Sequence, residues 1–145
     1  MAMRVNIEVN IDTQRLAKQF EALKDDKVMY QIHELFYLRC SPYVPMDTGM
    51  LNRPANVIKT KDSVTWTQPY ARYQYMGELY LAANGSSWAK KDEKKFPSGK
   101  PLHYNTEKHE LASKEWDKAM MRDKGDLFIK EVKDILMERF KELYG

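Results

Sequence analysis

The hydrophobic residues of the N-terminal part change their spacing from two positions to three or four. Val5, Ile7 and Val9 alternate with polar residues, which predicts a half-buried strand. The spacing then becomes helical and predicts either two helices in line or one kinked helix, ending before Pro42. The apolar positions of this helical face are Leu16, Phe20 and Leu23, followed after a polar break by Val28, Ile32, Leu35, Phe36 and Cys40.

The central part of the chain indicates a hairpin followed by one short helix. Runs rich in β-branched residues at 56–60 and 63–67 flank a two-residue turn, which is typical of two paired strands. Val64 and Trp66 share one face of the second strand, and we assign that face to the core. Residues 69–77 predict a short helix, because proline suits the first turn and glycine suits the C-terminal cap.

The C-terminal part is predicted to be helical in two pieces. Ser113 is the expected N-cap of a short helix that buries Trp116, and Gly125 opens the last helix. One side of this last helix is apolar and its other side is charged. The apolar residues are Phe128, Val132, Ile135, Leu136, Phe140 and Leu143.

Residues 82–100 have a different character from the rest of the chain. Small and polar residues surround a cluster of lysines, and we expect a mobile lysine-rich loop that leads into a return strand at 102–105. The loop is interpreted either as a solvated insertion or as an assembly arm that orders when it docks. In the free subunit we expect Trp88 to be exposed or disordered. The candidate residues of this arm are Trp88, Lys90, Lys91, Lys94, Lys95, Phe96 and Lys100.

Together these elements predict the α+β class. The expected arrangement is an antiparallel β-sheet of about four strands packed against long N-terminal and C-terminal helices. With 145 residues the chain has the length of one domain, so we assign residues 1–145 to a single domain.

Composition and charge narrow the function classes. The net charge of +3 is too small to favour nucleic-acid binding, and a single cysteine, Cys40, fits a reducing compartment. Cys40 is interpreted as a buried residue rather than a reactive thiol. Neither a membrane-spanning run nor a signal peptide is visible, so we expect a product made in the cytoplasm.

The search for chemistry gives no catalytic, cofactor-binding or metal-binding set. His33, His103 and His109 lack the spacing of zinc ligands. Asp47 lies between a proline and a glycine, and satisfying nearby backbone N–H groups is its simplest role. Neither a nucleophile elbow nor a Gly-rich phosphate loop occurs, so we expect a protein that is not an enzyme.

Three segments nevertheless resemble one known family. Residues 43–51 (YVPMDTGML) are similar to its P-x-D-T-G-x-L element, and residues 69–77 (PYARYQYMG) to a P-Y-A segment that follows a hairpin. An A-S-x-x-W block at 112–116 precedes the terminal helix. The chain thus resembles the minor capsid and head–tail joining (neck, tail-completion) proteins of tailed phages. The matching positions are Pro45, Asp47, Thr48, Gly49, Leu51, Pro69, Tyr70, Ala71, Tyr73, Gly77 and Trp116.

This resemblance implies a virion structural protein located at the head–tail junction. It implies no substrate, cofactor or membrane. Its implied partners are further copies of the chain in a ring and other neck or tail proteins. A small nucleic-acid-binding module that uses the lysine-rich loop is the alternative, and the salt dependence of binding would separate the two.

Overall fold

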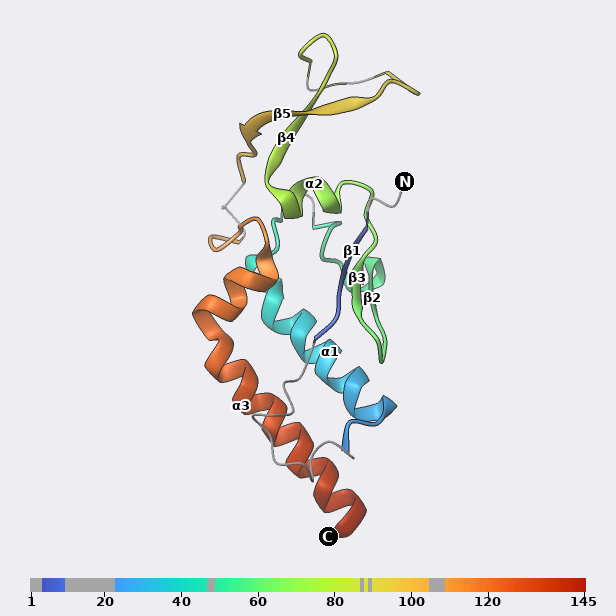
Figure 1. Ribbon diagram of the computed structural model, residues 1–145, viewed down its shortest axis with the longest axis vertical. Coiled ribbons are helices and arrows are strands. Elements are labelled where there is room, and N and C mark those ends of the chain that lie inside the picture. The colour runs from blue at the N-terminus through green and yellow to red at the C-terminus, as the bar shows by residue number, and fades with distance from the viewer. Residues whose placement is uncertain (1–3, 10–22, 47–48, 87, 89, 105–108) are drawn as a thin grey trace.

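The computed structural model describes residues 4–9, 23–46, 49–86, 88, 90–104 and 109–145. The long helices and a three-stranded sheet form the body, and a second, two-stranded sheet projects from one end of it (Figure 1). In chain order the helices and strands are β1 (Val5–Ile7), α1 (Asp26–Cys40), η2 (Ser41–Tyr43), η3 (Pro54–Asn56), β2 (Val57–Lys59), β3 (Val64–Trp66), α2 (Ala71–Met76), β4 (Glu78–Ala82), β5 (Lys95–Pro101) and α3 (Trp116–Tyr144).

The three-stranded sheet confirms the first predicted strand and the predicted hairpin. Its order is β1-β3-β2, fully antiparallel, and Val5 and Val57 are the cross-strand partners of Trp66. Because the side chains of a strand alternate between faces, Val5, Val57, Val64 and Trp66 share the inner face, and all four are buried. This face packs on α1, so the assignment of Val64 and Trp66 to the core is confirmed.

The first long helix begins and ends where the sequence indicates. Asp25 caps α1 by accepting a hydrogen bond from the Val28 N–H at 2.9 Å. The helix ends at Cys40, where η2 with Pro42 takes over. The helix predicted around Leu16 and Phe20 lies outside the described residues.

The second long helix packs antiparallel to the first. The rings of Phe36 and Phe128 meet edge to face, with 5.7 Å between their centroids. At the other end of the two helices, Arg139 forms an ion pair of 2.7 Å with Asp25. The two predicted C-terminal pieces are one helix with a kink at Lys124, beside the expected break at Gly125. Phe140 and Leu143, expected on the buried side, are 38% and 47% exposed.

Three further predictions need correction. In place of the expected single sheet of about four strands, the described residues form five strands in two sheets. The return strand is β5 at Lys95–Pro101, so the irregular segment within 82–100 is shorter than expected, and Leu102 follows the strand. Ser113 does not cap α3: Glu115 occupies the N-cap position at a φ of 47°, and the Ser113 Oγ has no hydrogen-bond partner among the described residues.

No helix in the described parts of the chain is both long enough and apolar enough to cross a bilayer.

Candidate functional site

The first motif folds into a loop that begins at η2. Tyr43, Pro45 and Leu51 are buried, so this loop contributes side chains to the core. Gly49 has a φ of +83°, as expected from a glycine at this place. Asp47 and Thr48 lie outside the described residues, and their predicted local role stays a prediction.

Asn52 connects this loop to three other parts of the body. Its side-chain Nδ2 donates to the Ser41 Oγ, and its Oδ1 accepts from the Trp66 indole Nε1, both at 2.9 Å. Its backbone carbonyl accepts from the Tyr37 hydroxyl at 2.7 Å. The sequence analysis missed this residue. A buried tryptophan needs an acceptor for its N–H, but the sequence does not say which residue supplies it.

The second motif is α2 and its cap. Ala71 is buried against the body, whereas Pro69 and Tyr70 are exposed. The ring of Tyr73 packs against the ring of Tyr80 of β4, with 4.5 Å between the ring centroids, which links this helix to the projecting sheet. Gly77 caps the helix at a φ of +70°.

Gly77 also sits in a crowded place. A Cβ atom at this position would lie 2.7 Å from the Cβ of Lys114 and 3.0 Å from the hydroxyl of Tyr104. The Gly77 carbonyl accepts from the N–H of Leu102 at 2.9 Å. Glycine is therefore required twice at this position, for its positive φ and for the close approach of the chain.

The third motif packs on the second motif and on the three-stranded sheet at Trp116. This fully buried indole meets Trp66 of β3 at 5.3 Å and Tyr75 of α2 at 4.9 Å, both edge to face. The Tyr75 hydroxyl donates to Asp117 at 2.7 Å, and burial together with this carboxylate raises the pKa of Tyr75. The predicted burial of Trp66 and Trp116 is confirmed.

Backbone hydrogen bonds close the same junction. The N–H of Ser113 donates to the Tyr43 carbonyl at 3.0 Å, and the N–H of Glu115 donates to the Tyr75 carbonyl at 2.8 Å. The segment before α3 is thereby bonded to the first motif and to the second. We call this meeting point of Tyr43, Tyr75 and Trp116 the motif junction.

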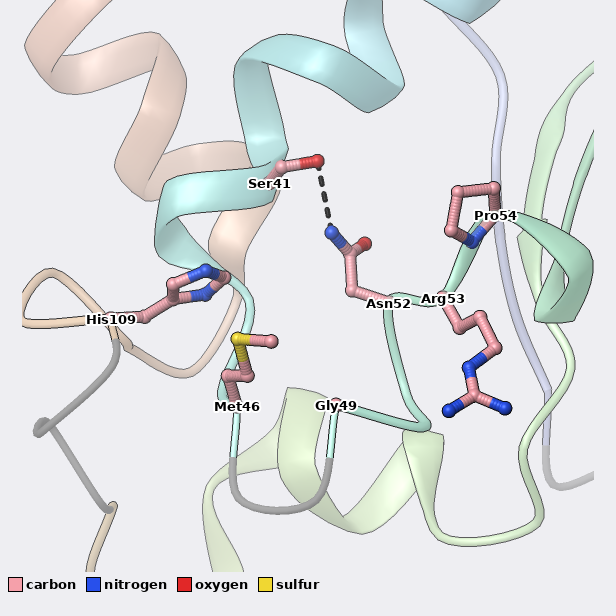
Figure 2. Close-up of a pocket in the computed structure, with 7 residues that line it drawn as sticks. All are labelled: Ser41, Met46, Gly49, Asn52, Arg53, Pro54 and His109. Atoms are coloured by element: carbon pink, nitrogen blue, oxygen red, sulfur yellow. Dashed lines mark hydrogen bonds between the residues drawn. The ribbon is translucent and has the colours of Figure 1, made fainter.

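One pocket of about 360 Å³ opens beside the first motif (Figure 2). The Ser41 hydroxyl is already committed, since it donates to the Tyr37 carbonyl at 2.8 Å and accepts from Asn52. A ring nitrogen of His109, Nδ1, lies 2.7 Å from the Val44 carbonyl. The pocket is lined by Ser41, Met46, Gly49, Asn52, Arg53, Pro54 and His109.

The remaining candidates for chemistry lie apart from this pocket or are inert. Cys40 is fully buried, and burial raises the pKa of its thiol far above neutral pH. His33 is buried in α1, and its Nε2 accepts a hydrogen bond from the Val9 N–H at 3.2 Å. Within the described ranges, no three His, Cys, Asp or Glu side chains are grouped so that they could hold a metal ion.

The candidate arm residues lie on the projecting hairpin. Trp88 is 71% exposed, which confirms the expectation for this residue, and Phe96 on β5 is 51% exposed. Lys90, Lys91, Lys94 and Lys100 are exposed, and Lys95 is half-buried in β5.

These features define a class, an α+β fold in which motif residues form a packed junction and a projecting hairpin carries exposed lysines together with exposed Trp88 and Phe96. Residues 5–134 match a family model described as minor capsid protein. The chain belongs to this minor capsid protein family and is a structural protein of the phage virion. No curated protein and no solved structure matches the chain.

Proposed function

We propose that this minor capsid protein is a non-enzymatic neck or tail-completion component that joins the phage head to the tail. The observation that carries the proposal is the motif junction. Three segments resemble head–tail joining proteins and are separated by up to about seventy positions. The third is hydrogen-bonded to the first at Tyr43 and packs on the second through Trp116 and Tyr75.

The residues of the junction act by packing and hydrogen bonding. Tyr75 and Trp116 bury their rings against each other, and Gly77 permits the close approach of the chain. Such a rigid centre suits a subunit that must hold its shape between two larger assemblies. Its proposed partners are further copies of itself in a ring and other neck or tail proteins, in a virion assembled in the host cytoplasm.

The test is a nonsense mutation of this gene in the phage, followed by electron microscopy of the lysate. DNA-filled heads and separate, complete tails are expected. Adding the purified protein to this lysate should restore joined particles and infectivity. Joined virions in the mutant lysate, or only empty heads, would contradict a role in joining.

Nucleic-acid binding through the exposed lysines is the competing function. Phosphate contacts release counterions, so such binding would weaken steeply as the salt concentration rises. We expect a labelled DNA duplex to show no saturable binding at physiological salt. Tight binding that the substitution of Lys90 and Lys91 by glutamate abolishes would favour the competing function.

A further inference from the structure

The projecting hairpin has one covered face and one uncovered face. Tyr80 of β4 packs on Tyr73 of α2, which covers one face at the base. Leu81 and Phe96 are cross-strand partners and therefore share the opposite face, where Phe96 is half exposed. A two-stranded sheet alone is of marginal stability in water, so an additional surface packed on this face would stabilise it.

The hairpin also concentrates the charge of the protein. The segment 82–100, called the arm from here on, carries five lysines against Asp92 and Glu93, a net charge of +3. The whole chain has the same net charge, so all residues outside the arm sum to zero. Among the described residues, Lys90, Lys91, Lys94 and Lys100 take part in no ion pair.

A surface of opposite charge lies on the two long helices. One side of α3 carries residues that follow one another at three or four positions and are therefore neighbours on the helix. They are Leu127, Glu131, Asp134 and Glu138. Glu131 bonds Arg39 of α1, which places this side next to α1. The ion pair between Lys27 and Glu142, at 3.3 Å, fixes the two helices at the other end.

The exposed surface of α1 next to Arg39 contributes an apolar residue, Leu38. Leu38 and Leu127, 55% and 46% exposed, lie near the end of the helix pair where Phe36 meets Phe128. We call the surface formed by Leu38, Leu127, Glu131, Asp134 and Glu138 the acidic face.

Two carboxylates of the acidic face have no cationic partner among the described residues. They are Asp134 and Glu138, although Lys130 and Lys141 lie three to four positions away on α3. Asp134 and Glu138 are also like charges at i and i+4, a pairing that destabilises a helix slightly. A cationic partner that approaches from outside would remove this repulsion.

We propose that the arm of one copy docks on the acidic face of a neighbouring copy. The lysines of the arm meet Asp134 and Glu138, and Trp88 and Phe96 pack beside Leu38 and Leu127. The arm projects from the α2 end of the body, away from the region where α1 and α3 lie side by side (Figure 1).

An arm that points away from its own body cannot reach its own acidic face, so the contact joins two copies. It uses different surfaces on the two copies. Two copies alone would have to exchange arms, whereas head-to-tail repetition closes a ring or extends a filament. The inference rests on the proposed function in that it supplies the contact between ring subunits.

Charge reversal in the purified full-length chain tests the contact. The variants Lys90→Glu/Lys91→Glu and Asp134→Lys/Glu138→Lys should each lower the self-association constant by roughly tenfold or more, because several rim charges turn from attraction to repulsion. An equimolar mixture of the two variants should associate again, since the arm of one then matches the face of the other. Sedimentation velocity at several salt concentrations is the measurement.

Matched controls separate this contact from a general effect of charge. Arg4→Glu/Lys133→Glu makes the same change as the arm variant, and Glu110→Lys/Asp126→Lys makes the same change as the face variant, all at exposed positions outside both surfaces. The controls should associate as the wild type does. A wild-type chain that stays monomeric, or reversed variants that associate normally, would overturn the proposal.

A failure of the charge-reversal experiment can be distinguished from a failure of the proposed function. If the nonsense mutant lacks joined particles but the charge variants associate like the wild type, only the docking of the arm is wrong. Loss of duplex-DNA binding in the arm variant, without any change in self-association, would also overturn it and would assign the arm to nucleic acid.

Discussion

Gly77 shows how one residue can be needed for two reasons. Its positive φ disfavours any side chain, and a Cβ atom would meet the Cβ of Lys114 at 2.7 Å. At Gly49 only the positive φ is a strong constraint, because the atom nearest to an added Cβ, at 3.3 Å, is the flexible end of the Met46 side chain. We expect Gly49→Ala to cost ~1 kcal/mol and Gly77→Ala ~2–3 kcal/mol of unfolding free energy.

Urea denaturation of both variants measures this difference. Gly85→Ala is the matched control, since its φ is also positive but nothing lies within 4 Å of the added atom. Equal losses at Gly77 and Gly85 would show that the crowding around Gly77 relaxes without cost.

Asn52 stabilises the body through hydrogen bonds that its side chain makes in two directions. Asn52→Ala leaves the buried indole N–H of Trp66 without its acceptor, which costs ~1–3 kcal/mol. Asn52→Asp keeps an acceptor for Trp66 and loses the donor to Ser41, so it should cost less. In a double-mutant cycle, Asn52→Ala should cost less when Trp66 is already phenylalanine. Additive losses would show that the two side chains are not coupled.

His33 makes the stability depend on pH below neutrality. Its side chain is buried, and burial lowers the pKa of the folded state below the ordinary value of about 6.5. Its Nε2 accepts from the Val9 N–H, so protonation there would break this bond. The unfolded chain therefore takes up a proton first as the pH falls through about 6.5, and stability falls from that pH downward.

Denaturation midpoints between pH 7.5 and 5.5 measure the effect of His33. His33→Gln, which keeps a polar side chain that does not titrate, should flatten the slope in this window. Two acids affect the stability at lower pH. Hydrogen bonds from the Val28 N–H and from Arg139 lower the pKa of Asp25, and a hydrogen bond from Arg39 lowers the pKa of Glu131. An unchanged slope in the variant would exclude His33 as the cause.

At the scale of elements, local signals predicted most of the body. The polar break before Val28, Pro42 after α1 and the β-branched runs of β2 and β3 each act on their own neighbourhood, so their consequences can be read from the sequence. The glycines themselves likewise indicated the backbone conformation at one position in each of the first two motifs. Gly49 and Gly77 both have positive φ.

The wrong or missing predictions concern features that depend on contacts between residues far apart in the sequence. β5 contains Pro97 and Pro101, and its pairing with β4 was not predicted because proline is rare inside strands. Ser113 has the type of an N-cap, but its N–H bonds the distant Tyr43 and the helix starts later. The contacts of Asn52 join residues up to fifteen positions apart, and no local pattern marks them.

The arm should be separable from the body as an element. Glu78 and Pro101 are cross-strand partners, so residues 79–100 can be replaced by a two-residue Asn-Gly turn. The shortened chain should unfold cooperatively, because Trp66, Trp116 and the helix pair remain. Near-UV circular dichroism of the buried tryptophans and the urea transition are the measurements. A loss of the tryptophan signal would show that the body depends on the arm.

At the scale of the whole molecule, the net charge is distributed unequally between the body and the arm. The body is neutral in sum and holds the motif junction, while the arm carries the entire net charge and two exposed aromatic rings. Long-range attraction would then act on the arm first and orient a neighbouring copy before close contact forms. The family match from residue 5 to residue 134 includes both parts.

The exposed lysines also turn the arm into a natural target for trypsin. This protease cleaves after lysine in segments that are accessible and only locally stabilised, and the tip of a two-stranded ribbon meets both conditions. Brief digestion of the free subunit should therefore first produce two fragments cut near Lys90 or Lys94, while the body survives. In joined virions the same peptide bonds should resist digestion. The pattern of fragments would therefore show whether the arms are docked in the assembled particle.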